Sequence, residues 1–399
     1  MPENNSKKYL LGNAIKIFCC LLVIGSFFIL LFQNHVAIFG HIGFGGLFVN
    51  DTLGMEENLK RFAEDSDGNF TGIYGVMLLY YPSFYLTRAY TLFVNVTFLI
   101  FAAIYFLETL FKLRVRLSLE KVILIFVIIL SNLYILQVLY FPNKEIPLIL
   151  LTNLFLYHFV INKKYTLIFI IILITLFIRD GHALILTLTF ILATLFNEFI
   201  KRKPIVFLIL ILALFSILSL EVIGSIGILG EYNYILDRNL DLANNPDSVV
   251  SSSILNTVPV YIAYPMKVIN HFISSAIRPQ FIDINNRVYV AGLGLWQNGI
   301  IILLGISSWI HLIRRNENSN IVIIGAIIIL GLLLISVGSF TQPRYMMPYI
   351  FWLAAGIVLI LDIKKIIIFV LIIFLISLLF LFLNLGVPVI PEGFDLHPW

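Results

Sequence analysis

Long apolar runs separated by short polar junctions dominate the pattern of hydrophobic and polar positions along the chain. Runs of about 15 to 20 apolar residues are long enough to cross a bilayer as helices. They are continuous rather than alternating, which favours helices over the strands of a membrane barrel. The expected spans are residues 14–32, 86–108, 122–141, 146–161, 165–178, 181–200, 204–223, 293–313, 321–338, 349–362 and 366–384. The pattern therefore predicts an all-α polytopic membrane protein with about eleven transmembrane helices.

Composition supports this class of protein. The 399 residues are 60% hydrophobic and 12% charged, with a mean hydropathy of +1.01. Such a chain has too little polar surface to be soluble in water, so the bilayer is its expected solvent. Helices that pack laterally in a membrane form one unit, and we expect residues 1–399 to make a single integral membrane domain. The net charge of +4 is small and indicates no nucleic-acid partner.

Basic residues alternate between the two sides of the predicted bundle. Of the 26 Lys and Arg residues, 16 fall on one set of alternate junctions and 10 on the other, which together give 26. The richer set is Lys7, Lys8, Lys16, Lys112, Arg114, Arg116, Lys121, Lys163, Lys164, Lys201, Arg202, Lys203, Arg314, Arg315, Lys364 and Lys365. Because positive charge near span ends marks the cytoplasmic side, we expect a cytoplasmic N-terminus and an outer C-terminus.

The long connections both fall on the expected outer side. Residues 33–85 form the first outer loop and residues 224–292 the second, whereas all cytoplasmic connections are short. The first contains GMEENLKRFAED, which is typical of a short amphipathic helix, and the second contains VPVYIAYPMKVINHFISSAI, which reads as an interfacial or re-entrant helix. Loops longer than a connection requires usually bind or catalyse, so function is expected at this side.

Several outer cations lie in short turns that hold them near the headgroup plane. Lys144 occurs in FPNKEIP, Arg179 in FIRDGH and Arg344 in QPRYMMP, while Arg278 in SSAIRPQ belongs to the second long loop. Each one alone is as well explained by contact with lipid headgroups. Together they oppose the orientation rule and predict a site for an anionic ligand such as a phosphate or diphosphate.

Three further residues extend this predicted phosphate site. Arg88 begins the second span and serves either the ligand or only as an anchor for that span. His182 follows Arg179 and either orients a phosphate or caps the helix that begins there. Tyr345 directly follows Arg344 and is included with it.

Carboxylates in the first outer loop supply the complementary charge. A carboxylate beside a cationic diphosphate site is the arrangement needed to deprotonate an acceptor hydroxyl while the leaving phosphate is stabilised. Asp51 is the best placed, and Glu56 is the second candidate for this catalytic role. His35 and His41 share the loop with Asp51, but no recognised ligand spacing supports a metal, so no metal or other cofactor is predicted.

The stretch TQPRYMMPYIFWLAAG, the turns PNKEIP and IRDGH, and the long first loop carrying Asp51 resemble bacterial multi-spanning glycosyltransferases of the GT-C type. This group includes or resembles polymerases of O-antigen and capsule repeat units. The resemblance implies an enzyme of the bacterial inner membrane that acts on a polyprenyl-diphosphate-linked oligosaccharide at the outer leaflet. It assigns Asp51 as the first-loop acid, and Arg344, Lys144 and Arg179 as basic groups around the lipid phosphate. It also implies membrane lipids, a chain-length regulator and other polysaccharide-assembly proteins as partners.

Alternatives remain open at this point. A transferase of single sugars that uses a polyprenyl-phosphate sugar donor would need the same cations but only one lipid-linked substrate. A flippase for the lipid-linked glycan predicts a polar central path and repeat symmetry, and neither is visible in the sequence. A non-catalytic scaffold predicts no concentration of cations at one depth. The enzyme hypothesis requires the fold to bring Arg179, Arg278 and Arg344 together within reach of Asp51.

Overall fold

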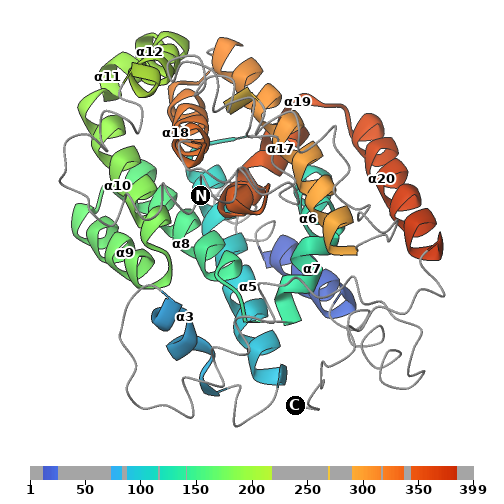
Figure 1. The fold of residues 1–399 in the computed structure, drawn as a ribbon. Helices are drawn as coiled ribbons and strands as arrows, with labels where there is room; N and C mark the ends of the chain where they lie inside the picture. The colour runs from blue at the N-terminus through green and yellow to red at the C-terminus, as the bar shows by residue number, and fades with distance from the viewer. Residues whose placement is uncertain are drawn as a thin grey trace, which may run out of the picture.

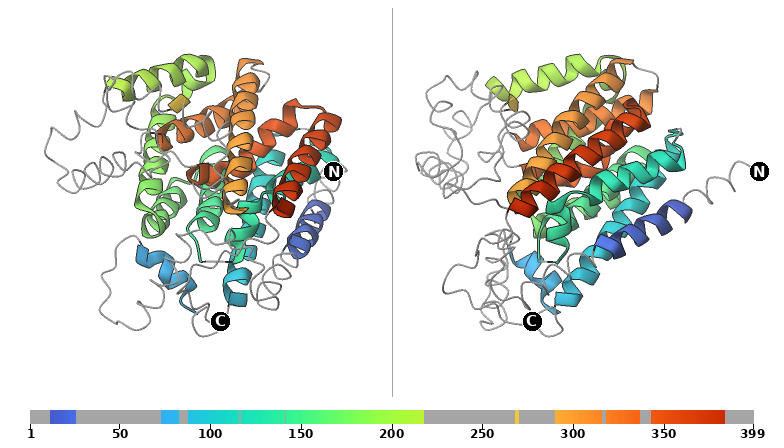
Figure 2. Two further views of the ribbon diagram at one scale, coloured as in Figure 1. Left: turned by 45° about the vertical axis from the view of Figure 1, so that its right-hand side comes forward. Right: turned by 90° about the vertical axis from the view of Figure 1, so that its right-hand side faces the viewer.

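The structure is a computed structural model that describes residues 12–25, 73–82, 88–115, 117–140, 142–217, 268–269, 290–315, 318–336 and 343–383. Every regular element within these ranges is a helix. The longer helices slant together as one bundle, with α9 and α10 at the left and α20 at the right of Figure 1. The right-hand view of Figure 2 shows that most of them run side by side in nearly the same direction. The predicted all-helical fold is confirmed for the described residues.

The helices follow the apolar runs of the sequence. An N-terminal helix covers Gly12–Gly25. The remaining elements are α3 (Ile73–Tyr80), α5 (Arg88–Lys112), α6 (Leu119–Leu130), α7 (Leu133–Tyr140), α8 (Glu145–Tyr157), the π-helix η2 (His158–Asn162), α9 (Tyr165–Ile178), α10 (Asp180–Leu195), α11 (Asn197–Arg202), α12 (Pro204–Ile217), α17 (Val290–Arg315), α18 (Ser319–Ile335), the 3-10 helix η3 (Pro343–Tyr349), α19 (Ile350–Ile360) and α20 (Ile363–Leu383).

Three of the described helical stretches are long and apolar enough to cross a membrane: Tyr90–Lys112, Glu145–Asn162 and Trp296–Arg315. Others are apolar but shorter, such as α9 and α18. Large apolar side chains also face outward, including Phe169, which is 67% exposed, and Leu195, which is 71% exposed. A helix that exposes such side chains is suited to a hydrocarbon environment. These features indicate a membrane protein.

The centre of the bundle is built from α5, α8, α17 and α19, which pack closely in pairs. Trp309 on α17 and Trp352 on α19 are both buried, and the Trp309 indole donates to the Trp352 carbonyl oxygen at 2.7 Å. Gly356 allows this approach, because a Cβ atom there would lie 2.8 Å from the Trp309 indole nitrogen. Small residues commonly permit close helix packing in membranes.

Buried amides within the apolar runs join the helices. The Asn95 side-chain amide donates to the carbonyl oxygens of Val138 and Leu139 at 3.2 and 2.9 Å. Asn153 accepts a hydrogen bond from the Trp352 indole at 2.9 Å. In hydrocarbon such bonds satisfy groups that have no water to contact. The His158 ring instead bonds to the Asn162 amide within its own π-helix.

The predicted span at residues 122–141 is divided into α6 and α7. Asn132 Oδ1 accepts from the backbone N–H groups of Tyr134 and Ile135 at 2.9 and 3.3 Å, and Gln297 Oε1 accepts from Leu133 N–H at 2.9 Å. Side-chain amides therefore take over the bonds that a continuous helix would make along its own backbone. Asn132 is a single polar residue within an apolar run, so the hydropathy pattern of the sequence did not reveal this break.

The α5 helix ends in a Schellman motif. Val115 N–H donates to the Leu110 carbonyl at 3.1 Å and Arg114 N–H donates to the Phe111 carbonyl at 3.0 Å. Arg114 has a φ of 56° and occupies the left-handed position where glycine is most common. A residue with a Cβ atom is strained there by about 1 to 2 kcal/mol.

Candidate anion-binding site

The 3-10 helix η3 carries the motif RYMMPY to the interior of the bundle. It packs against α8, α17, α18 and α19, and Pro348 lies inside it. Proline lacks a backbone N–H group, so regular α-helical bonding cannot run through it and the α-helix α19 begins only afterwards. Met346 and Met347 are fully buried, whereas Arg344 and Tyr345 are half-buried. The η3 helix therefore fixes Arg344 and Tyr345 at the edge of the packed core.

Arg179 occupies the one-residue connection between α9 and α10. It has an extended backbone, with φ −160° and ψ 107°, and its N–H group donates to the Thr175 carbonyl at 2.7 Å. The next residue, Asp180, accepts from Gly181 N–H at 2.7 Å. The α9 helix ends directly before Arg179 and α10 begins directly after it. Because these two helices pack together, they set the position of Arg179.

Arg179 and Arg344 meet at the ring of Tyr345. The guanidinium carbon of Arg179 lies 4.2 Å from the ring centroid, and that of Arg344 lies 5.1 Å from it. Arg344 Nη2 also donates to the Tyr345 hydroxyl at 3.3 Å. We call these three residues the Arg–Tyr–Arg cluster. The fold thus brings together two of the cations that the sequence predicted for one site.

The electrostatics of this cluster favour an anion. Each guanidinium gains about 0.5 to 1 kcal/mol from the ring when it is exposed to solvent, and more when it is desolvated. Within the described residues Arg179 forms no ion pair with a carboxylate. Guanidinium groups bind phosphate oxygens through two parallel N–H groups, so two of them at one ring can hold a phosphate or diphosphate.

His182 lies in the packed interior beside the cluster. It is 3% exposed, and its Nε2 atom lies 3.0 Å from the Thr152 hydroxyl of α8. Its ring contacts the edge of the Tyr349 ring, with centroids 6.3 Å apart. His182 therefore links α8, α10 and η3, and its predicted contact with a phosphate stays a prediction.

Lys144 precedes the first residue of α8. It is half-buried, and its backbone N–H group donates to the Glu145 carboxylate at 3.2 Å. Asn143 fixes this turn, because its Oδ1 atom accepts from Ile146 N–H at 2.8 Å and its amide donates to the Val138 carbonyl at 2.6 Å. The α8 helix that follows packs against η3. Lys144 therefore lies at the N-terminal end of a helix that packs against η3, and its predicted phosphate contact stays a prediction.

The remaining predicted site residues are not placed by the structure. Asp51, Glu56 and Arg278 lie outside the described residues, as do His35 and His41. Arg88 begins α5, but its side chain is not among those described. The predicted catalytic roles of Asp51 and Glu56 and the phosphate contacts of Arg278 and Arg88 stay predictions. In the part of the chain that the structure describes, no group of three or more His, Cys, Asp or Glu side chains is placed to hold a metal ion.

Two residues beside the cluster were not identified from the sequence. Thr152 holds His182 from within an apolar run, where a threonine gives no signal of its own. Tyr349 is 1% exposed, and its hydroxyl has no hydrogen-bond partner among the described residues. Gly331 on α18 accommodates that hydroxyl, because a Cβ atom there would lie 2.1 Å from it. The sequence feature that could have pointed to Tyr349 is its spacing from Tyr345 within RYMMPY.

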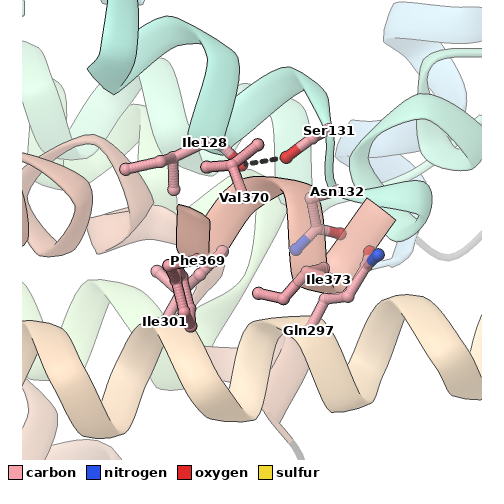
Figure 3. A pocket seen from close by; sticks show the side chains of 8 residues that line it. All are labelled: Ile128, Ser131, Asn132, Gln297, Ile301, Phe369, Val370 and Ile373. Carbon is pink, nitrogen blue, oxygen red and sulfur yellow. Dashed lines mark hydrogen bonds between the residues drawn. The ribbon is translucent and has the colours of Figure 1, made fainter. Parts of the chain in front are cut away.

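A crevice lies at the break between α6 and α7, with polar groups at its edge. Figure 3 shows Ser131, Asn132 and Gln297 at its upper and right sides. The rest of its lining is apolar: Ile128, Ile301, Phe369, Val370 and Ile373. Ser131 donates to the Ile128 carbonyl at 3.1 Å, and both amides bond to the backbone of the break. These polar groups therefore bond to backbone atoms at the break between the helices. No charged side chain is among the residues that line the crevice.

Comparisons of the chain with protein-family models, curated proteins and solved structures found no match.

Proposed function

We propose that this protein is a membrane glycosyltransferase of cell-surface polysaccharide synthesis, and specifically a polymerase of O-antigen or capsule repeat units. The observation that carries the proposal is the convergence of Arg179 and Arg344 on Tyr345. These residues come from distant parts of the chain and were predicted to bind one lipid-linked diphosphate. A scaffold gives no reason for two cations to converge on one ring.

In the proposed reaction the anomeric carbon of a polyprenyl-diphosphate-linked glycan is attacked by a hydroxyl of an acceptor glycan. Asp51 or Glu56 takes the hydroxyl proton, a C–O bond to the acceptor forms, and the bond to the diphosphate oxygen breaks. Negative charge then develops on the departing diphosphate, where Arg179 and Arg344 stabilise it. Lys144, Arg278 and Arg88 add positive charge around the same group, and Tyr345 orients the two guanidinium groups.

The proposal includes a topology. The chain crosses the bacterial inner membrane about eleven times, with a cytoplasmic N-terminus and an outer C-terminus. The Arg–Tyr–Arg cluster then faces the outer leaflet, where lipid-linked glycan is available. Lys144 and Arg179 lie at the ends of predicted spans on that side, which supports a shared depth for these cations.

The test is separate replacement of Arg179 and Arg344 by alanine in a strain whose surface glycan is resolved by chain length. Loss of one preorganised donor to developing charge lowers a rate on the order of 100-fold. A polymerase therefore predicts collapse to a single repeat unit while the lipid-linked precursor persists. Arg315→Ala is the matched control, because Arg315 is exposed at the far end of α17.

Two outcomes distinguish the alternatives. Normal long chains in both variants, at normal protein levels, would overturn the proposal. Loss of the first repeat unit itself would instead indicate a single-sugar transferase acting on a polyprenyl-phosphate donor. Replacing Arg179 or Arg344 by lysine separates the effect of the positive charge from that of the guanidinium geometry. Lysine keeps the charge but lacks the paired N–H groups.

A further inference from the structure

The ends of α5 and α8 form a second cluster of basic and aromatic side chains, at the opposite end of α8 from Lys144. The two helices pack along each other, and their apolar stretches end together at Lys112 and Asn162. The Lys112 ammonium group donates to the Tyr157 hydroxyl, which fixes the two ends against each other. The proposed reaction uses none of these residues.

The Lys112 ammonium group lies over one ring of an aromatic group. Its nitrogen lies 4.6 Å from the centroid of the Tyr157 ring. The Tyr157 ring contacts Tyr105 at 5.3 Å and His158 at 5.1 Å between centroids, both edge to face. Tyrosine and lysine are the residues typical of a helix end at the boundary between hydrocarbon and headgroups.

The backbone departs from regular geometry at both helix ends. The α8 helix widens into the π-helix η2, a form that occurs mostly as single turns at functional sites. Lys163, which directly follows η2, has a φ of 48°. Arg114, which follows the end of α5, has a φ of 56°. Glycine adopts this conformation without strain. The chain instead carries a cation at both left-handed positions.

Positive charge exceeds negative charge at this shared end. Lys112, Arg114, Lys163 and Lys164 are all exposed. Glu108 contributes a carboxylate, whose oxygen is 4.0 Å from the Lys112 nitrogen in a pair that is open to solvent. Exposed pairs of this kind contribute little, so most of the positive charge is available to a ligand.

We propose that the shared end of α5 and α8 binds the phosphate group of an anionic membrane lipid. Lys112, Arg114, Lys163 and Lys164 supply the charge. The half-buried Tyr105 ring lies against the upper part of the lipid chain, and the buried Tyr157 holds Lys112 in place through its hydroxyl. The site faces the side of the membrane that the charge distribution predicts to be cytoplasmic. This inference stands apart from the proposed enzymatic activity, because it concerns the other end of the bundle.

The experiment uses the purified, delipidated full-length protein in detergent, with bound lipid counted by native mass spectrometry. The probes are short-chain phosphatidylglycerol, short-chain phosphatidylcholine and inorganic phosphate. We expect phosphatidylglycerol to bind more tightly than phosphatidylcholine, and Arg114→Gly and Lys163→Gly each to weaken it about fivefold, as expected for one cation near a membrane surface.

Thermal unfolding of the same variants separates binding from folding. Glycine relieves the left-handed strain, so neither variant should unfold at a lower temperature than the parent protein. Lys201→Gln is the matched control, because Lys201 is basic, lies on the same predicted side and pairs with Glu198 at 2.6 Å. Equal binding of the two lipids, unchanged binding in both glycine variants, or displacement of the lipid by inorganic phosphate would overturn the proposal.

Discussion

The guanidinium carbon of Arg179 lies 4.2 Å from the centroid of the Tyr345 ring, although the two residues belong to separate apolar hairpins of the sequence. Arg344 reaches the same ring at 5.1 Å. Both guanidinium groups therefore lie near one ring, and a bound anion would offset the repulsion between these two like charges. In the proposed reaction both cations would be in place before the diphosphate binds, which is the condition for effective stabilisation of developing charge.

Replacement of Tyr345 tests whether the ring organises the two arginines. Tyr345→Phe keeps the ring face and removes only the 3.3 Å hydrogen bond from Arg344, so polymer length should change little. Tyr345→Leu removes the ring, and two lost cation–π contacts of about 0.5 to 2 kcal/mol each predict a fall in activity of roughly tenfold or more. Polymer length and precursor level are the measurements. Equal activity of the phenylalanine and leucine variants would contradict an organising role for the ring.

The sequence predicted much of this arrangement for identifiable reasons. Spans could be placed because apolar runs as long as residues 146–161 have few interpretations other than a membrane helix. Arg179 and Arg344 were selected because short turns hold both cations at a predicted depth. Asn95 and Asn153 are amides within apolar runs, a setting that favours hydrogen bonds between helices, and both form such bonds.

Other features depend on partners that sequence spacing does not reveal. The break after α6 requires Gln297, which is distant in sequence and reaches Leu133 only in the folded bundle. The burial of His182 follows from the packing of α8 against α10, and Thr152 has no pattern that marks it as a partner. The Tyr345 ring, which both arginines contact, belongs to a 3-10 helix that contains Pro348.

Thr152→Val tests the structural part played by His182. Valine keeps the shape of threonine but leaves the buried Nε2 atom of His182 without its bond, which costs about 1 to 3 kcal/mol. We expect a lower midpoint of thermal unfolding in detergent. Adding His182→Leu to Thr152→Val should recover part of this loss, because both polar partners are then absent. A double variant less stable than the sum of the two single changes would contradict the pairing.

Tyr349→Phe should raise stability. The Tyr349 hydroxyl is buried without a hydrogen-bond partner among the described residues, so removing it avoids a desolvation penalty of about 1 to 3 kcal/mol. Thermal unfolding in detergent is the measurement. Tyr165→Phe is the matched control, since Tyr165 is 55% exposed and its hydroxyl should contribute little. A marked loss of stability in Tyr349→Phe would show that the hydroxyl has a partner that supports the fold.

Asn132→Ala should destabilise the bundle more than a surface amide would. Asn132 Oδ1 accepts two backbone N–H groups at the start of α7, and its amide donates to Asn298. Removing the Asn132 side chain leaves these groups without that partner, and a buried group left unsatisfied costs about 1 to 3 kcal/mol. We expect a total loss of about 2 to 4 kcal/mol, read from denaturant unfolding in detergent. Asn320→Ala is the control, because Asn320 lies exposed near the start of α18. Equal losses in the two variants would mean that α6 and α7 join into one continuous helix at little cost, and that the amides do not maintain the break.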